Sequence, residues 1–147
     1  MALGDCDLIL TTESEVGPSC EVLREVPLRW VGAPGSAAWR QRPLRLAYCR
    51  HCTFRRGDIA TLEAAGISGE MAVESDSDRT IEGTVSADPV IASMQEGAEP
   101  RHLACIATGG ALPDPGEPKI AIYGRAAGLP PVAGSPRDPI REGYRGL

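Results

Sequence analysis

Short apolar segments alternate along the chain with polar connections rich in glycine and proline, and helical spacing occurs in only a few places. Apolar or alternating runs of four to eight residues bounded by turn residues are typical of β-strands. The sequence therefore predicts strands at residues 6–12, within 21–35 before a turn at Gly-Ala-Pro-Gly, and at 43–48, 70–75, 89–94, 102–107 and 119–124.

Two segments have the spacing of helices. The first is 53–65, where Thr53 is the predicted N-cap, Gly66 the predicted C-cap, and four apolar residues form one stripe: Phe54, Ile59, Leu62 and Ala65. The second is 77–87. A tail rich in proline and glycine, 125–139, precedes a short helix expected at 140–144. Strands interleaved with helices predict an α/β domain with some parallel pairing.

Composition and charge narrow the class of protein. A chain of 147 residues suits one domain, and a net charge of −5 argues against a protein that wraps DNA. No run is long and apolar enough to span a membrane, and the first ten residues lack the pattern of a secretory signal. Five cysteines at irregular spacings predict free thiols in a reducing compartment, the cytoplasm.

The densest group of reactive side chains is "CRHCTFRR", residues 49–56. Cys49, His51 and Cys52 are candidate zinc ligands, but no second Cys-x-x-Cys or His pair completes a zinc site, so we expect neither a metal nor another cofactor. His51 and His102 have no serine or aspartate partner at a hydrolase spacing. We therefore predict no catalytic residues and no enzyme.

Two other interpretations of the same segment remain open. A Cys49-x-x-Cys52 pair between a strand and a helix start is the arrangement in which a thiol pKa falls, as in thiol–disulfide oxidoreductases. Alternatively, the helix N-terminus and three arginines (Arg50, Arg55 and Arg56) form a pocket for a carboxylate or phosphate. In the simplest arrangement the arginines are solvated, and Arg55 pairs with Asp58 on the same helix.

Five segments, taken in order, resemble one family. They are "LGDCDLILTT", "EVLREVPLRWVGAPGSAAW", "PLRLAYCRHCTFRRGDIATLEAAG", "AVESDSDRTIEGTVSADPVIASM" and "GGALPDPGEPKIAIYG". They resemble the effector-binding domain of LysR-type transcriptional regulators. The resemblance implies a periplasmic-binding-protein-like fold of the second type, with two α/β lobes and a small effector in the cleft between them.

The resemblance covers only the carboxy-terminal part of such a domain. It implies one full lobe plus the returning part of the other: residues 1–12 leave lobe one, 13–118 are mainly lobe two, and 119–147 return to lobe one. The DNA-binding helix-turn-helix of the family has no counterpart in this sequence, so the chain looks like a truncated form of a longer regulator. DNA contact is expected only through that missing segment, and the intact protein is expected to form homo-oligomers.

The resemblance also implies effector-binding residues. These are Thr11, Thr12, Cys52, Thr53, Phe54, Arg55 and Ser75, although Ser75 could instead cap the helix that follows. The expected function is ligand sensing without catalysis, with a small anionic effector and no membrane partner. The alternatives are a thiol–disulfide oxidoreductase using Cys49 and Cys52, and a solute-binding protein of a transporter.

Overall fold

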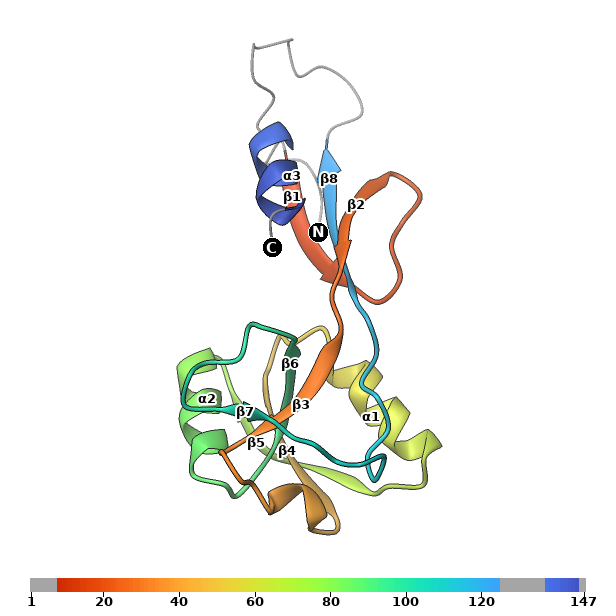
Figure 1. The fold of residues 1–147 in the computed structure, drawn as a ribbon. Helices are drawn as coiled ribbons and strands as arrows, with labels where there is room; N and C mark the ends of the chain where they lie inside the picture. Colours follow the sequence, from red (N-terminus) through yellow and green to blue (C-terminus); the bar gives the residue numbers. More distant parts are fainter. Residues whose placement is uncertain (1–7, 125–136, 146–147) are drawn as a thin grey trace. The chain divides into compact units, whose positions relative to one another are not determined.

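The computed structural model describes residues 8–124 and 137–145, and it divides the chain into two compact units (Figure 1). Unit 1 contains Met1–Val26 and Pro118–Leu147, and unit 2 is Pro27–Glu117. Strands and helices alternate in unit 2, so the predicted α/β class is confirmed. The predicted lobe-two segment began at residue 13, whereas the second compact unit begins at Pro27.

Unit 1 is built on a three-stranded antiparallel sheet. The strands β1 (Leu8–Glu13) and β2 (Cys20–Glu25) both pair with β8 (Lys119–Gly124), which lies between them. The helix α3 (Arg137–Arg145) is longer than the predicted 140–144. Arg141 attaches α3 to β2, because its Nε and Nη2 donate to the two carboxylate oxygens of Glu21 at 2.6 and 2.8 Å.

The segment 21–35 contains two strands, not the single strand that the sequence predicted. β2 ends at Glu25, and β3 (Leu28–Gly32) belongs to a different sheet. Pro27 separates them, since it has no N–H to donate to a ladder. Its neighbours bond on either side: Val26 N–H donates to Pro118 O at 3.1 Å, and Leu28 N–H to Gly116 O at 2.8 Å.

The strands of unit 2 form a mixed arrangement. β3 pairs antiparallel with β6 (Ala92–Gln95) and β7 (Ala104–Cys105), and β4 (Leu44–Cys49) pairs with β5 (Gly69–Ser75) in parallel. The predicted parallel pairing is therefore present. Ile91 joins the two groups, because its N–H donates to Arg45 O and its carbonyl accepts from Ala47 N–H. β6 and β7 are shorter than predicted, and a 3₁₀ turn, η1, covers Ala38–Arg40.

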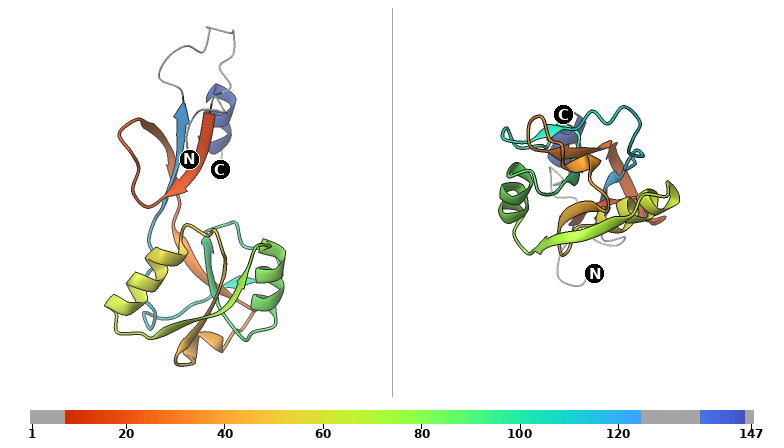
Figure 2. Two further views of the ribbon diagram at one scale, coloured as in Figure 1. Left: turned by 180° about the vertical axis from the view of Figure 1, so that it is seen from behind. Right: turned by 90° about the horizontal axis from the view of Figure 1, so that it is seen from below.

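Two helices cover opposite sides of these strands, α1 (Arg55–Ala64) on one and α2 (Asp78–Ser86) on the other (Figures 1 and 2). β4 explains this arrangement, since both of its faces are buried. Leu44, Leu46 and Tyr48 pack with Leu62 of α1 in one core cluster, and Ala47 packs with Ile81 and Val85 of α2 in another. The end of β4 is thereby fixed between the first turns of two helices.

The buried face of α1 differs from the predicted stripe. Leu62 is buried and Ile59 packs against the same cluster, but Ala65 is exposed. The other fully buried residue of the helix is Asp58, which is polar. Helical periodicity predicted the correct buried side of α1 but did not predict that Asp58 lies on it.

The end of α1 is set by Gly66, as predicted. Gly66 has φ +71°, its N–H donates to Glu63 O at 2.9 Å, and the N–H of Ile67 donates to Leu62 O at 2.9 Å. This pair of bonds is the Schellman pattern, in which a residue in the left-handed region ends the helix.

A glycine exchange tests this helix end. Gly66→Ala should lower the free energy of unfolding by about 1 kcal/mol, because alanine is strained at this φ. Gly57→Ala in the first turn of the same helix should raise it by about 0.5 kcal/mol, since its Cβ would meet nothing within 4 Å. Urea unfolding of both variants measures the difference, and equal effects would contradict the assignment.

Candidate functional site

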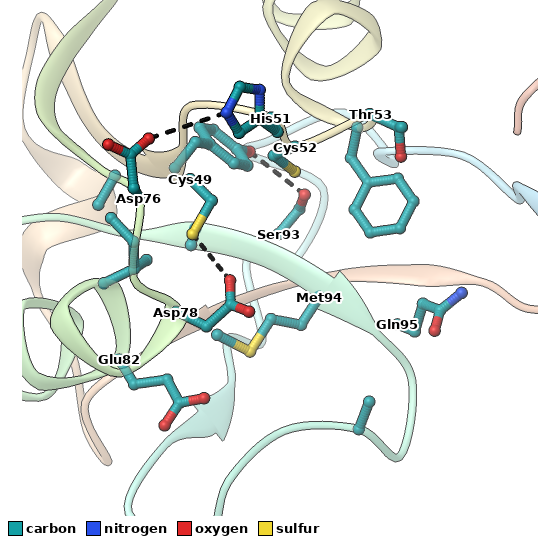
Figure 3. Close-up of a pocket in the computed structure, with 16 residues that line it drawn as sticks. Cys49, His51, Cys52, Thr53, Asp76, Asp78, Glu82, Ser93, Met94 and Gln95 are labelled. Atoms are coloured by element: carbon teal, nitrogen blue, oxygen red, sulfur yellow. Dashed lines mark hydrogen bonds and ion pairs between the residues drawn. The ribbon is translucent and has the colours of Figure 1, made fainter. Parts of the chain in front are cut away.

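A pocket of about 520 Å³ lies in unit 2 where β4 ends and α1 and α2 begin (Figure 3). Its walls come from the end of β4, the turn before α1, the first turn of α2, and β6 with the residues after it. Phe54, Ile81, Ala92 and Met94 supply apolar surface. The volume and the mixture of apolar and polar groups are those of a small-molecule site.

A buried hydrogen-bond network forms one wall. Tyr48 and Ser93 line the pocket, and both hydroxyls donate to Oδ2 of Asp58, from Tyr48 at 2.6 Å. Asp58 is fully buried, and its Oδ1 has no hydrogen-bond partner among the described residues. Burial raises the pKa of Asp58, against the two hydroxyl hydrogen bonds that lower it. Burial, and then the nearby Asp58 carboxylate, raise the pKa of Tyr48 well above its usual value.

The thiol of Cys49 points at the start of α2, where it donates to Oδ1 of Asp78 at 2.7 Å (Figure 3). Burial, followed by this bond and the charge of Asp78, raises the pKa of Cys49 to about 11. Burial also raises the pKa of Cys52. A thiol–disulfide oxidoreductase needs a depressed thiol pKa, so the structure does not favour that hypothesis.

The thiol of Cys52 faces the start of α1. The predicted N-cap, Thr53, is wrong by one residue, because Phe54 takes the cap position and no side chain makes a capping hydrogen bond there. The backbone N–H groups of Phe54 and Arg55 lower the pKa of the Cys52 thiol, although burial outweighs them. The helix start therefore acts on this thiol in the predicted direction, and burial reverses the net shift.

Two of the three arginines of this segment, Arg50 and Arg55, lie against carboxylates of β5 and of the loop after it. Arg55 Nη1 donates to Glu74 Oε1 at 2.5 Å, so the alternative in which Arg55 pairs with Asp58 is wrong. Arg50 Nε lies 3.6 Å from Oδ1 of Asp76. His51 Nε2 lies 3.9 Å from the same oxygen, as the dashed line in Figure 3 shows. Neither Arg50 nor Arg55 lines the pocket.

Solved structures provide the comparison that decides the fold. The regulatory domain of HypT from Salmonella typhimurium, bound to bromide, superposes with a TM-score of 0.71 at 17% identity, over 98% of this chain and 75% of that one. The CcmR regulatory domain from Synechocystis, in complex with 2-PG, gives 0.69 at 10% identity, over 97% and 76%. HinK, a LysR family transcriptional regulator from Pseudomonas aeruginosa, gives 0.64 at 13% identity, over 97% and 54%.

This is the fold of a LysR-type regulatory domain. The predicted periplasmic-binding-protein-like fold is therefore confirmed in partial form, since the chain spans about half the length of HinK. No protein-family model and no curated protein matches the chain.

The seven predicted effector-binding residues lie in both units of the structure. Cys52, Thr53 and Phe54 line the pocket of unit 2. Arg55 and Ser75 lie outside that lining, and the hydroxyl of Ser75 accepts a hydrogen bond from Ser77 N–H at 3.1 Å, just before α2. Thr11 and Thr12 lie on β1 of unit 1, opposite Ala121 and Ile120.

Sequence analysis missed several polar residues of the pocket in unit 2. Tyr48, Asp78, Glu82, Ser93 and Gln95 line it, and Asp58 lies behind its wall. One signal was available: Asp58 lies four positions after Phe54 and four before Leu62, on the predicted buried side of the helix. Within the described residues, no group of three or more His, Cys, Asp or Glu side chains is placed to hold a metal ion. None of the described helices is long and apolar enough to cross a membrane.

The thiol of Cys49 gives a direct test of the pocket's electrostatics. At neutral pH, iodoacetamide should alkylate Cys49 about a hundredfold more slowly than it alkylates free glutathione, because a pKa of about 11 leaves little thiolate. Asp78→Asn should accelerate the reaction, since it removes the charge beside the sulfur. Peptide mass spectrometry over a pH series gives the rate at this site, and a rate equal to that of glutathione would contradict the assignment.

Proposed function

We propose that this chain is the ligand-sensing part of a LysR-type transcriptional regulator, without catalytic activity of its own. The observation that carries the proposal is the pocket of about 520 Å³, bounded by the end of β4 and the starts of α1 and α2 within a LysR-type regulatory fold. A small molecule bound there would contact Thr53 and Phe54 before α1, Asp78 and Glu82 of α2, and Met94 of β6.

Sensing requires that the effector favour one conformation of the regulator over another. In this chain the pocket lies between the first turns of two helices, and α1 and α2 belong to separate core clusters. A ligand that contacts both helices changes the free energy of one arrangement relative to the other. DNA contact would come from a helix-turn-helix segment of the intact regulator, which would act in the cytoplasm as a homo-oligomer.

Chromatin immunoprecipitation tests the regulatory role. An antibody raised against this chain should recover discrete DNA sites from the source cell, because the intact product carries both the sensor and the DNA-binding segment. Transcription from genes beside those sites should change when the gene for this chain is deleted. Recovery of no enriched site would contradict the proposal.

A pocket-filling variant tests the sensing role. Thr53→Trp places a large side chain in the pocket from an exposed position, and it should abolish regulation while DNA occupancy remains. Ala64→Trp is the matched control, because Ala64 is exposed on α1 outside the lining. Unchanged regulation in the Thr53 variant would show that the pocket is not the sensor.

A further inference from the structure

The charge of the pocket is opposite to what an anionic effector needs. Three carboxylates line it: Asp76, Asp78 and Glu82. Among the described residues that line the pocket there is no lysine or arginine, and the one titratable base is His51, which lies against Asp76. Figure 3 shows the three acids along one side of the pocket, with Thr53 and Gln95 on the other.

The cations nearby do not offset these acids equally. Arg50 lies beside Asp76, so part of the charge of that carboxylate is offset. Arg55 is bound by Glu74, outside the pocket. Asp78 accepts only the neutral thiol of Cys49, and no ion pair to Glu82 occurs within the described ranges. Asp78 and Glu82 lie one turn apart on α2, so their charges add on one face of the pocket.

The thiol of Cys52 faces the helix N-terminus that would hold an anion, and the backbone N–H groups of Phe54 and Arg55 lower its pKa. An anionic ligand at this helix start would also have to approach Asp78 and Glu82. That approach costs free energy, and no lysine or arginine among the described lining residues offsets it.

The buried wall supports the same conclusion independently of the acids on α2. Asp58 lies directly behind Tyr48 and Ser93, is fully buried, and has one oxygen without a partner. Because the hydroxyl hydrogens of Tyr48 and Ser93 are directed at Asp58, the two hydroxyl oxygens remain as acceptors. They therefore favour a hydrogen-donating group on the pocket side of the wall.

The remaining lining is apolar and polarisable. Phe54, Ile81 and Met94 surround the space beside the acids. An aromatic ring and a thioether both interact favourably with a cation or with an apolar body that carries one. The pocket thus offers an apolar compartment with a negative side.

We infer that the pocket binds a small organic cation, an ammonium group on an apolar body, and not a carboxylate. This inference rests on the proposed sensing function and specifies its ligand class. The ammonium group would lie beside Asp78 and Glu82, and the apolar body against Phe54 and Met94. The effector charge is thereby opposite in sign to the one expected from the arginines of the sequence.

Three probes of similar size separate charge from shape: 2-phenylethylammonium, the neutral 2-phenylethanol, and the anion 3-phenylpropanoate. Isothermal titration calorimetry on the 147-residue chain at neutral pH and low ionic strength should find the cation bound at least about tenfold more tightly than the anion. The alcohol should fall between them. Added salt should weaken the cation's binding and leave that of the alcohol unchanged.

Charge-neutralising variants assign the effect to residues. Glu82→Gln should weaken binding of 2-phenylethylammonium about fivefold and leave binding of the alcohol unchanged. Adding Asp78→Asn should weaken it further. Glu63→Gln is the control, since Glu63 is an exposed acid on α1 outside the lining. Among the described residues, no side-chain hydrogen bond or ion pair involves Glu82 or Glu63. Thermal unfolding by circular dichroism should therefore be unchanged in both single variants.

The outcomes are distinct from those of the DNA experiment. Tighter binding of the anion would overturn the inference while leaving a sensor in place. No binding of the cation, or equal weakening by Glu63→Gln and Glu82→Gln, would also overturn it. Failure of the sensing proposal itself is seen separately, as absence of recovered DNA sites.

Discussion

Asp58→Ala should lower the free energy of unfolding of unit 2 by about 3 kcal/mol. The substitution leaves the buried hydroxyls of Tyr48 and Ser93 without their carboxylate acceptor, and each such loss costs about 1–3 kcal/mol. It also opens a small cavity beneath α1. Asp58→Asn should cost much less, because the amide oxygen can accept both hydrogen bonds.

Urea unfolding followed by tryptophan fluorescence measures this loss, because Trp30 and Trp39 both belong to unit 2. Glu63→Ala on the same helix is the control and should change the free energy of unfolding by less than about 0.5 kcal/mol. Equal losses in the alanine variants of Asp58 and Glu63 would contradict the buried network.

The same carboxyl group makes stability depend on pH. Burial raises the pKa of Asp58 in the folded state, so the native protein holds this proton more tightly than the unfolded chain does. Stability should therefore fall as pH rises from the unfolded carboxyl value, about 3.9, through the raised folded value. Asp58→Asn should remove this dependence of the free energy of unfolding on pH. An unchanged dependence in the variant would contradict the raised pKa of Asp58.

Trp30→Ala should be the most destabilising single substitution considered, at about 3–5 kcal/mol. Trp30 is only 4% exposed, packs in the core cluster with Leu46 and Leu62, and donates Nε1–H to Pro113 O at 2.8 Å. Such a loss is a large part of the stability of a typical domain.

Far-UV circular dichroism during urea unfolding measures the effect, because the substitution removes a fluorophore. Trp30→Phe keeps much of the packing and removes the N–H donor, so it should cost about 1–2 kcal/mol. A cost below about 1 kcal/mol for Trp30→Ala would mean that this cluster does not hold β3 in place.

Sequence alone predicted those features that depend on neighbouring residues. Gly66 ends α1, the strand predicted at 43–48 is β4 at Leu44–Cys49, and the strand predicted at 119–124 is β8, because each is specified by a local pattern. The split at Pro27 was missed, since the apolar pattern continues across it. The two strands are distinguished by their pairing partners, because β2 pairs with β8 and β3 pairs with β6 and β7.

The candidate site shows the same limit. The cluster at 49–56 was found from its residue types, and five of its members line the pocket: Cys49, His51, Cys52, Thr53 and Phe54. Its electrostatics was not found, because Arg55 pairs with a glutamate 19 residues away and Asp58 is bonded by a serine 35 residues away. The arginines of segment 49–56 alone predicted an anionic ligand. The carboxylates that line the pocket come from the loop after β5 and from α2, outside that segment.

The bond between Leu28 N–H and Gly116 O holds the entry and exit of unit 2 side by side. Unit 2 is therefore one continuous segment inserted into unit 1, and its first and last residues lie next to each other. Domains with neighbouring ends tolerate insertion and exchange. Every residue that lines the pocket lies within this insertion. Recombination at its two ends could replace one ligand specificity by another in a single event, without altering the strands that precede and follow it.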